Sequence, residues 1–449
     1  MSRYLDRLAD GLRTRGGADL HVVQSDGGSA RVERASRLPV ATLLSGPAAG
    51  VRGAFGVSRA AGIERILTFD MGGTSTDVAL CDGAVPARAD VVVGGFPARV
   101  ATIDVHTVGA GGGSIARLDA GGALRVGPRS AGADPGPACY GRGDEFTVTD
   151  AQAVLGRLDA RGLLGGTMPI DVDRARRAAT PLLEAFPDVE AAAQAVVAVA
   201  TANMERALRL VSVQRGYDPR EFTLVAFGGA GPLHACALAD ALEMPRVLVP
   251  AIPGVLAALG AVQSDLTATR TRSVLTPFAE ASYVILTAAL EAAGVEVRAE
   301  LGPGARVTYA LDLRYLGQSY ELAVPVPAPD ALGDAAEGFH ALHERRFAHA
   351  DRTAEVEVVN VRASAVVTAD VEVPPPTFGP AGAAPAGSMP TRFGGAWIDT
   401  PRYAREALAP GDRIEGPAVV TQLDATTLIE PGWGATVDAR GNLLMEHIR

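Results

Sequence analysis

Two aspartates enclose a run of glycines and hydroxyl side chains that is suited to holding a phosphorylated ligand. The run reads Asp70-Met71-Gly72-Gly73-Thr74-Ser75-Thr76-Asp77. Adjacent glycines let backbone amides approach a phosphate because no Cβ is in the way, and a nearby carboxylate can hold a hydrated Mg²⁺ ion. An ordinary hairpin with a Gly-Gly turn is the alternative, but the flanking carboxylates and three hydroxyls favour phosphate binding. The predicted phosphate contacts are Gly72, Gly73, Thr74, Ser75 and Thr76, and the predicted metal ligands are Asp70 and Asp77.

Two further glycine clusters follow apolar segments of the chain. Gly228-Gly229-Ala230-Gly231 lies between a predicted strand at 223–227 and a predicted helix at 232–243, where backbone N–H groups at a helix N-terminus attract anions. Gly111, Gly112 and Gly113 form a second Gly-rich turn, which follows a predicted strand at 102–108. Tight strand–helix packing would explain one cluster alone. Three clusters together favour a single nucleotide site in which the loops at 70, 109 and 228 converge on one cleft.

Three titratable residues are candidates for proton transfer. Asp104 and His106 alternate within the predicted strand at 102–108, so both side chains are expected on one face. A carboxylate beside an imidazole suits acid–base work or contact with a metal. Asp150 follows the loop at 134–141 and is a candidate for the same cleft. We therefore predict that Asp104, His106 and Asp150 handle protons or contact the substrate.

The elements that must hold these residues indicate an α/β protein. Apolar runs at 65–69 and 78–80 enclose the first glycine run with no helical period after it, which predicts strand–turn–strand in place of the strand–loop–helix of Rossmann and P-loop sites. Residues 189–213 have helical periodicity, and alternation beyond residue 275 predicts strands. We expect a core over 1–270 and a strand-rich module over 275–449, with a Pro-rich linker near 373–390.

The composition excludes several classes of protein. All 41 basic residues of this 449-residue chain are arginine, so a P-loop lysine and a Schiff-base lysine are excluded. A net charge of -10 without a basic run argues against nucleic-acid binding. Three scattered cysteines, a charged N-terminus and apolar stretches too short to span a bilayer predict a soluble cytoplasmic protein with no membrane contact.

Several motifs in a fixed order give the chain a resemblance to a known family. Residues 69–77 resemble a phosphate motif of the actin/Hsp70/sugar-kinase superfamily. The whole set is similar to the hydantoinase/5-oxoprolinase A-type subunit family, which includes the acetone carboxylase β subunit. The resemblance implies an actin-like (ribonuclease H-like) core. Besides residues 70–77, the motifs lie at residues 44–51 (LSGPAAGV), 107–114 (TVGAGGGS), 134–141 (DPGPACYG), 227–234 (FGGAGPLH), 314–320 (RYLGQSY) and 416–419 (GPAV).

The same resemblance implies a reaction. It implies ATP and Mg²⁺ as cofactors and a cyclic amide, such as hydantoin or 5-oxoproline, as substrate. It also implies that the backbones of Gly72, Gly73 and Gly111–Gly113 cradle the phosphate. The amide carbonyl oxygen would attack the γ-phosphate, and water would open the ring of the resulting imidoyl phosphate. A B-type hydantoinase subunit is the implied partner, in a hetero-oligomer. A carboxylase-type subunit that phosphorylates a ketone and bicarbonate is the alternative enzyme.

One departure from the family pattern concerns the N-terminus. The family normally begins with a further domain that carries its own Asp-x-Gly-Gly-Thr loop, whereas here such a loop occurs only at Asp70. We therefore expect a core that is incomplete at the N-terminus, a separate N-terminal lobe as a partner, and weak ATP binding by the chain alone. A truncated, non-catalytic lobe that binds a partner is the competing interpretation.

Overall fold

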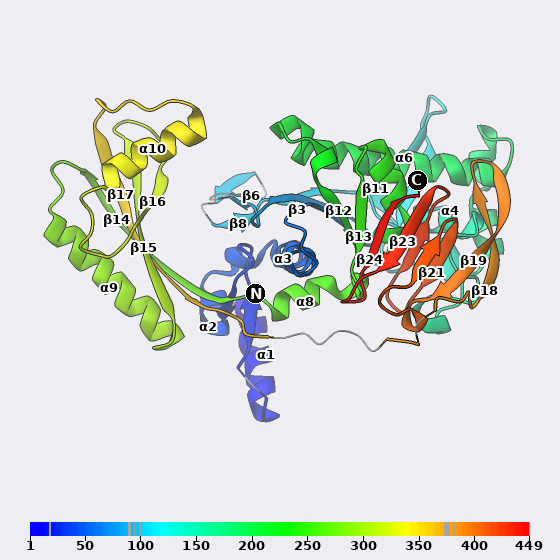
Figure 1. The fold of residues 1–449 in the computed structure, drawn as a ribbon, viewed down its shortest axis with the longest axis horizontal. Coiled ribbons are helices and arrows are strands. Elements are labelled where there is room, and N and C mark those ends of the chain that lie inside the picture. Colours follow the sequence, from blue (N-terminus) through cyan, green and yellow to red (C-terminus); the bar gives the residue numbers. More distant parts are fainter. Residues whose placement is uncertain are drawn as a thin grey trace. The chain divides into compact units, whose positions relative to one another are not determined.

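The computed structural model describes residues 1–17, 19–88, 91–93, 95–98, 100–371, 378–380 and 382–448, which form two units (Figure 1). The smaller unit comprises Met1–Gln24, Gly28–Thr42 and Ser264–Asp370. The larger unit comprises Ser25–Gly27, Leu43–Gln263 and Val371–Arg449. Within the described ranges, none of the helices combines the length and the apolar character needed to cross a membrane.

An eight-stranded sheet forms the centre of the larger unit, in the order β20-β23-β24-β13-β12-β3-β4-β9. β12 (Thr223–Phe227) runs parallel to both β3 (Arg65–Met71) and β13 (Arg246–Val249), and the other neighbours are antiparallel. All five residues of β12 are buried because both faces of the sheet are covered. The other strands are β4 (Thr76–Asp82), β9 (His106–Val108), β20 (Arg413–Glu415), β23 (Trp433–Val437) and β24 (Leu443–His447).

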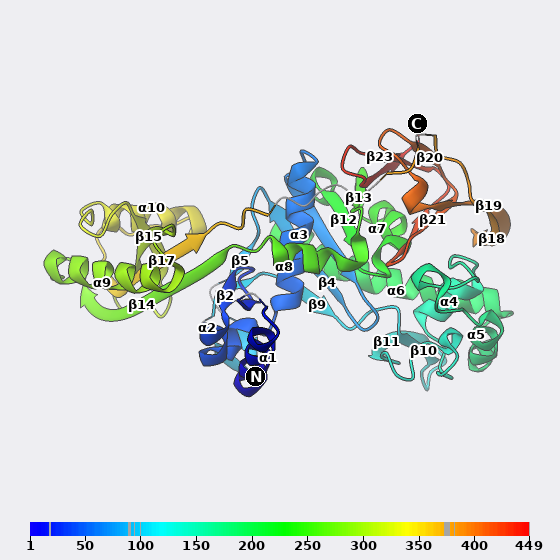
Figure 2. The same cartoon turned by 90° about the horizontal axis from the view of Figure 1, so that it is seen from below.

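Helices cover both faces of this sheet (Figure 2). α3 (Ser45–Ala60) and α8 (Leu256–Val262) pack on the face that carries Ile66 and Val225. α6 (Val189–Val211) and α7 (Ala235–Ala241) pack on the opposite face, which carries Leu67 and Leu224. Adjacent residues of one strand therefore face different helices, as the two-residue period of a strand requires.

Further elements of the larger unit surround the sheet. An insertion between β9 and α6 holds β10 (Ser114–Leu118), β11 (Leu124–Ser130), α4 (Val148–Val154) and α5 (Val172–Ala178). A four-stranded sheet is formed by β18 (Gly387–Phe393), β19 (Ala396–Ala404), β21 (Ala418–Thr421) and β22 (Thr426–Ile429). Short pairs are formed by β5 (Ala87–Arg88) with β8 (Thr102–Ile103) and by β6 (Val91–Val93) with β7 (Phe96–Ala98).

The smaller unit contains a six-stranded sheet in the order β1-β2-β14-β17-β15-β16. Its strands are β1 (His21–Val23), β2 (Ser29–Arg31), β14 (Leu266–Pro277), β15 (Arg306–Tyr315), β16 (Leu322–Val326) and β17 (Val356–Val367). Its helices are α1 (Ser2–Thr14), α2 (Val32–Arg37), α9 (Tyr283–Leu301) and α10 (Ala335–Phe347).

The strand–turn–strand expected around the first glycine run is confirmed by β3 and β4, and the long helix is confirmed by α6. The division of the chain into the two units does not follow the boundary expected near residue 270. β14 and β17 pair in the smaller unit while β20, β23 and β24 extend the main sheet, so strand pairing divides residues 275–449 between both units. Of the expected linker at 373–390, residues 373–377 and 381 lie outside the described residues, and β18 begins at Gly387.

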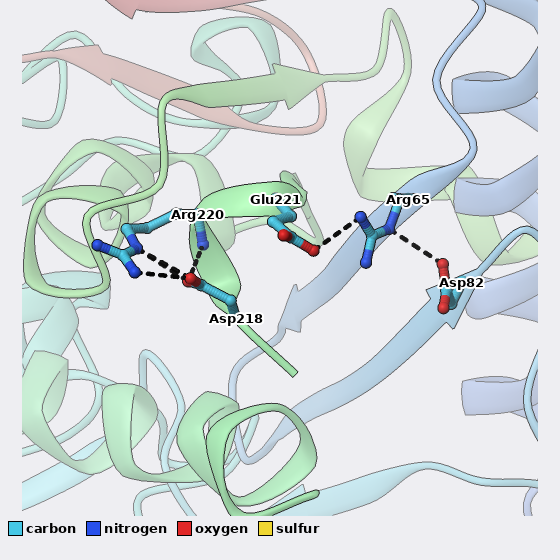
Figure 3. Close-up of polar contacts among 5 residues, drawn as sticks. All are labelled: Arg65, Asp82, Asp218, Arg220 and Glu221. Atoms are coloured by element: carbon cyan, nitrogen blue, oxygen red, sulfur yellow. Dashed lines mark hydrogen bonds and ion pairs between the residues drawn. The ribbon is translucent and has the colours of Figure 1, made fainter. Parts of the chain in front are cut away.

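Ion pairs join the strand ends opposite the glycine turn (Figure 3). Arg65, which begins β3, donates from Nε to Asp82 at the end of β4 at 3.0 Å and lies 2.8 Å from Glu221, just before β12. The neighbouring Asp218 accepts from the guanidinium of Arg220 at 2.7 Å. These exposed contacts add little stability, but they align the starts of β3 and β12, so that both strands end beside the glycine turn.

Candidate functional site

Backbone hydrogen bonds bring the three glycine clusters together at one end of the main sheet. The amides of Gly112 and Gly113 donate to the carbonyl oxygens of Gly72 at 2.9 Å and Gly73 at 2.7 Å. The amide of Ala230 donates to the Met71 carbonyl at 3.0 Å. The predicted convergence of the loops at 70, 109 and 228 is therefore confirmed. The binding roles of these residues stay predictions.

Glycine is needed in this cluster for two different reasons. A Cβ on Gly111 would lie 2.7 Å from the Gly73 backbone, and one on Gly228 would lie 2.5 Å from the Met71 carbonyl oxygen. A Cβ on Gly72 or Gly73 would meet nothing within 4 Å. The glycines at 111 and 228 thus allow the loops to pack, whereas those at 72 and 73 leave the turn open on its outer side. The open side is the one a phosphate would approach.

A cavity of about 340 Å³ adjoins this turn. Gly72, Gly73, Gly112 and Gly229 contribute to its lining. Such a volume with mostly apolar walls and a few polar groups is typical of a small-molecule site. The apolar walls come from Leu158, Leu163, Leu164, Met168, Leu233 and Leu423, and the polar lining includes Thr149, Gln152, His234, Gln422 and Asp424.

A buried chain of polar side chains supports the cavity, and it was not among the residues predicted from sequence. Arg157 donates to Gln152 Oε1 at 3.3 Å, Gln152 Nε2 lies 3.2 Å from His234 Nε2, and Thr201 Oγ1 lies 3.3 Å from His234 Nδ1. Burial, with the charge of Arg157, lowers the pKa of His234 to about 3, so the imidazole is neutral. Arginine can only donate, so the Gln152 amide donates to Nε2, and the ring proton sits on Nδ1.

Asp70 and Asp77 lie directly opposite each other on β3 and β4. Burial raises the pKa of Asp70 to about 7, and the charge of Asp77 adds to the effect. Burial also raises the pKa of Asp77, although a hydrogen bond from the Thr107 hydroxyl partly offsets it. No described cation or hydrogen-bond donor contacts the Asp70 carboxylate. Such a pair fits a divalent cation, which would remove the cost of two facing negative charges.

The two carboxylates would supply only part of a coordination shell. The described residues contain no group of three or more His, Cys, Asp or Glu side chains that could hold a metal. Mg²⁺ usually keeps several waters and takes further oxygens from phosphate. The pair therefore fits Mg²⁺ held jointly with a phosphorylated ligand.

The hydroxyl of Thr76, a predicted phosphate contact, is bonded to a neighbouring loop. Its Oγ1 donates to the Ala110 carbonyl oxygen at 2.6 Å, and the side chain is fully buried. The Thr76 hydroxyl therefore joins the turn to the loop at 109–113 by a hydrogen bond. It is not available to a phosphate in this arrangement. Thr74 is exposed in the turn and Ser75 is half-buried there, so both stay available for phosphate.

Asp104 and His106 are not brought to the glycine turn. The expected single strand is broken into β8 and β9, and Asp104 lies between them. Arg215 donates to Asp104 at 2.6 Å, and Arg88 lies 3.5 Å away, so the carboxylate is neutralised by ion pairs. His106 lines a different cavity, against α6. The expected alternation of Asp104 and His106 within one strand is therefore not present. Their predicted roles in proton transfer or substrate contact stay predictions.

Asp150 has a structural role at the start of a helix, and its predicted role in proton transfer or substrate contact stays a prediction. It is fully buried and accepts from the amides of Ala138, Cys139 and Thr147 and from the Thr147 hydroxyl. With Thr147 it forms a capping box at the start of α4. The spacing Thr147-x-x-Asp150 is the sequence signal of such a box.

Replacing Asp150 by alanine is expected to destabilise the fold by about 3 kcal/mol or more, because three buried amides lose their acceptor. Asp188→Ala is the matched control, since Asp188 caps α6 with a single bond to the Ala191 amide and should cost about 1 kcal/mol. Urea unfolding followed by circular dichroism measures both. An Asp150→Ala variant of unchanged stability would contradict the capping role.

The chain matches known proteins over most of its length. The family model described as hydantoinase/oxoprolinase matches residues 1–270, and the hydantoinase/oxoprolinase C-terminal domain matches residues 298–447. The chain is 35% identical to caprolactamase subunit alpha of Pseudomonas jessenii, covering 98% of this chain and 66% of that protein. It is 32% identical to 5-oxoprolinase 1 of Arabidopsis thaliana, covering 99% of this chain but only 37% of that protein.

Solved structures extend the likeness to the fold. The nucleotide-free structure of an acetone carboxylase, from work on ATP-dependent acetone carboxylation, superposes with a TM-score of 0.86 at 25% identity, covering 100% of this chain and 67% of that one. The ATP-dependent caprolactamase of Pseudomonas jessenii superposes with a TM-score of 0.78 at 32% identity, covering 100% of this chain and 68% of that one. The expected mixed α/β fold of the actin-like ATPase type is confirmed. The chain belongs to the hydantoinase/oxoprolinase family.

Proposed function

We propose that this chain is the nucleotide-binding part of an ATP-dependent hydrolase subunit that activates a cyclic amide by phosphorylating its carbonyl oxygen. The observation that carries the proposal is the Asp70–Asp77 pair, which lies beside three converging glycine loops and lacks a described neutralising partner for Asp70. Relatives named for lactam hydrolysis, a caprolactamase subunit and a 5-oxoprolinase, support the choice of substrate class.

The residues have distinct roles in this proposal. Asp70 and Asp77 hold Mg²⁺, and the open turn at 72–75 with the loops at 111–113 and 228–231 fixes the phosphates. When bound, ATP supplies the phosphoryl group that makes the amide carbon electrophilic. The chain's own contribution is positioning and charge stabilisation, which dominate catalysis of phosphoryl transfer. The apolar cavity beside the turn receives the nucleoside and keeps water away from it.

The second candidate is a carboxylase-type subunit that phosphorylates a ketone and bicarbonate, and the TM-score of 0.86 with acetone carboxylase favours it. A non-catalytic lobe that binds a partner is the third. Because the chain spans 66% of the caprolactamase subunit and 37% of the 5-oxoprolinase, we propose that activity needs a further lobe or a B-type subunit. We place the assembly in the cytoplasm, without nucleic acid or membrane.

Mg²⁺-dependent release of phosphate from ATP tests these candidates. The chain is assayed alone and after co-expression with the neighbouring subunit genes, with 5-oxoproline, hydantoin, caprolactam, or acetone plus bicarbonate. We expect release only from the co-expressed assembly and only with one of the cyclic amides. Stimulation by acetone and bicarbonate alone would favour the carboxylase. If ADP binding is absent from every one of these samples by calorimetry, the non-catalytic lobe is favoured.

A further inference from the structure

A second cavity of about 580 Å³ lies behind the glycine loop, between α6, β9 and β11. Its walls are largely apolar and include Val108, Val126, Val199 and Leu210. The backbone of Gly109 and Ala110 forms part of it. This cavity shares no lining residue with the one beside the glycine turn.

The polar groups of this second cavity are basic or neutral. Arg125 is paired with Asp119 at 2.9 Å, and Asn203 donates weakly to the Val126 carbonyl at 3.4 Å. The side chains of Arg206 and His106 make no hydrogen bond or ion pair with any described residue. No carboxylate is found among the described residues that line the cavity.

We propose that this cavity binds a small aliphatic carboxylate. The carboxylate would accept from the Arg206 guanidinium and the His106 imidazole, and the hydrocarbon chain would lie against Val199 and Leu210. Arg206 is exposed and carries a positive charge that is unpaired among the described residues. It would repel a cation, and a neutral alcohol would form no charge-assisted hydrogen bond with it. Charge-assisted hydrogen bonds to arginine are about twice as strong as neutral ones, and apolar walls reward the buried chain.

The position of the cavity gives the bound ligand a contact with the phosphate loop. The Ala110 carbonyl accepts from the Thr76 hydroxyl, and the next residues of the loop bond the turn at Gly72 and Gly73. A ligand that packs against Gly109 and Ala110 should therefore slow hydrogen exchange of the amides at 110–114. This readout needs no nucleotide and does not depend on the proposed activity.

Calorimetric titration of the full chain with hexanoate, in the absence of nucleotide, tests the proposal. We expect saturable binding that Arg206→Gln weakens about tenfold or more and that Ala202→Trp, which fills the cavity, prevents. 1-Hexanol and hexylammonium have the same chain length and should bind at least about tenfold more weakly. Arg220→Gln is the control, because it removes one positive charge without lining the cavity (Figure 3).

Three results would overturn the inference. Hexanoate that fails to bind, or that binds no better than hexanol, would remove the carboxylate requirement. Unchanged binding by Arg206→Gln, or equal weakening by Arg206→Gln and Arg220→Gln, would show that Arg206 does not hold the ligand. Unchanged exchange at 110–114 in saturating hexanoate would place the ligand elsewhere.

Discussion

Replacing Gly228 by alanine is expected to abolish nucleotide binding and to lower the free energy of unfolding by about 2–5 kcal/mol. Gly228 has a φ of +77°, which costs an L-residue about 1–2 kcal/mol. Its new Cβ would also lie 2.5 Å from the Met71 carbonyl oxygen and closer still to Asp70 Oδ1. Overpacking of this kind typically costs about 1–3 kcal/mol. Relief of the clash would push the loop away from the Asp70 carboxylate.

Gly216→Ala separates the two contributions. Gly216 has a similar φ of +84°, but a Cβ there would meet nothing within 4 Å, so only the backbone cost of about 1–2 kcal/mol is expected. Urea unfolding measures stability, and calorimetry with ADP and Mg²⁺ measures binding. If both variants lose the same stability and Gly228→Ala still binds ADP as the wild type does, the close packing of the loops is not needed for the site.

The parts of the site that could be predicted from sequence are those set by short segments. Two adjacent glycines between apolar runs specify a hairpin turn with little help from the rest of the chain, and β3 and β4 follow. The capping signal of Asp150 is equally local, because its partner Thr147 lies three residues earlier in the sequence. Thr147 marks the start of a helix, and its hydroxyl and the Asp150 carboxylate form the capping box there.

The parts that were missed depend on residues distant in the chain. Arg215 neutralises Asp104 across 111 positions, and no strand periodicity can reveal that contact. The support of the cavity joins Gln152 to His234 across 82 positions. His234 ends the glycine-rich motif at 227–234, which was the available signal. Only the fold shows that its imidazole is buried, neutral and held by an amide whose orientation Arg157 sets.

Replacing Asp70 by asparagine is expected to abolish Mg²⁺-dependent ATP hydrolysis by the complete assembly, while it makes the metal-free chain more stable above pH 7. The loss of hydrolysis follows from the proposed metal site. Asn offers a neutral oxygen where Mg²⁺ requires a carboxylate, so we expect a loss of at least about 10²–10³-fold, as for other preorganised charge-stabilising groups. Asp82→Asn is the control on the same hairpin, at the opposite end of β4 (Figure 3), and should retain hydrolysis.

The gain in stability follows from the raised pKa of Asp70. A carboxyl group whose folded pKa is about 7 and whose ordinary value is 3.8 costs no stability below about pH 4, and the cost grows as pH rises to about 7. A shift of about three pKa units corresponds to about 4 kcal/mol. The advantage of Asp70→Asn in urea unfolding with EDTA should therefore be near zero at pH 4 and reach a plateau of this order above pH 7. Adding Mg²⁺ at pH 8 should stabilise the wild type and leave Asp70→Asn unchanged. Equal stability of both proteins at pH 8 would show that the facing carboxylates carry no such cost, and the argument for a cation between them would fail.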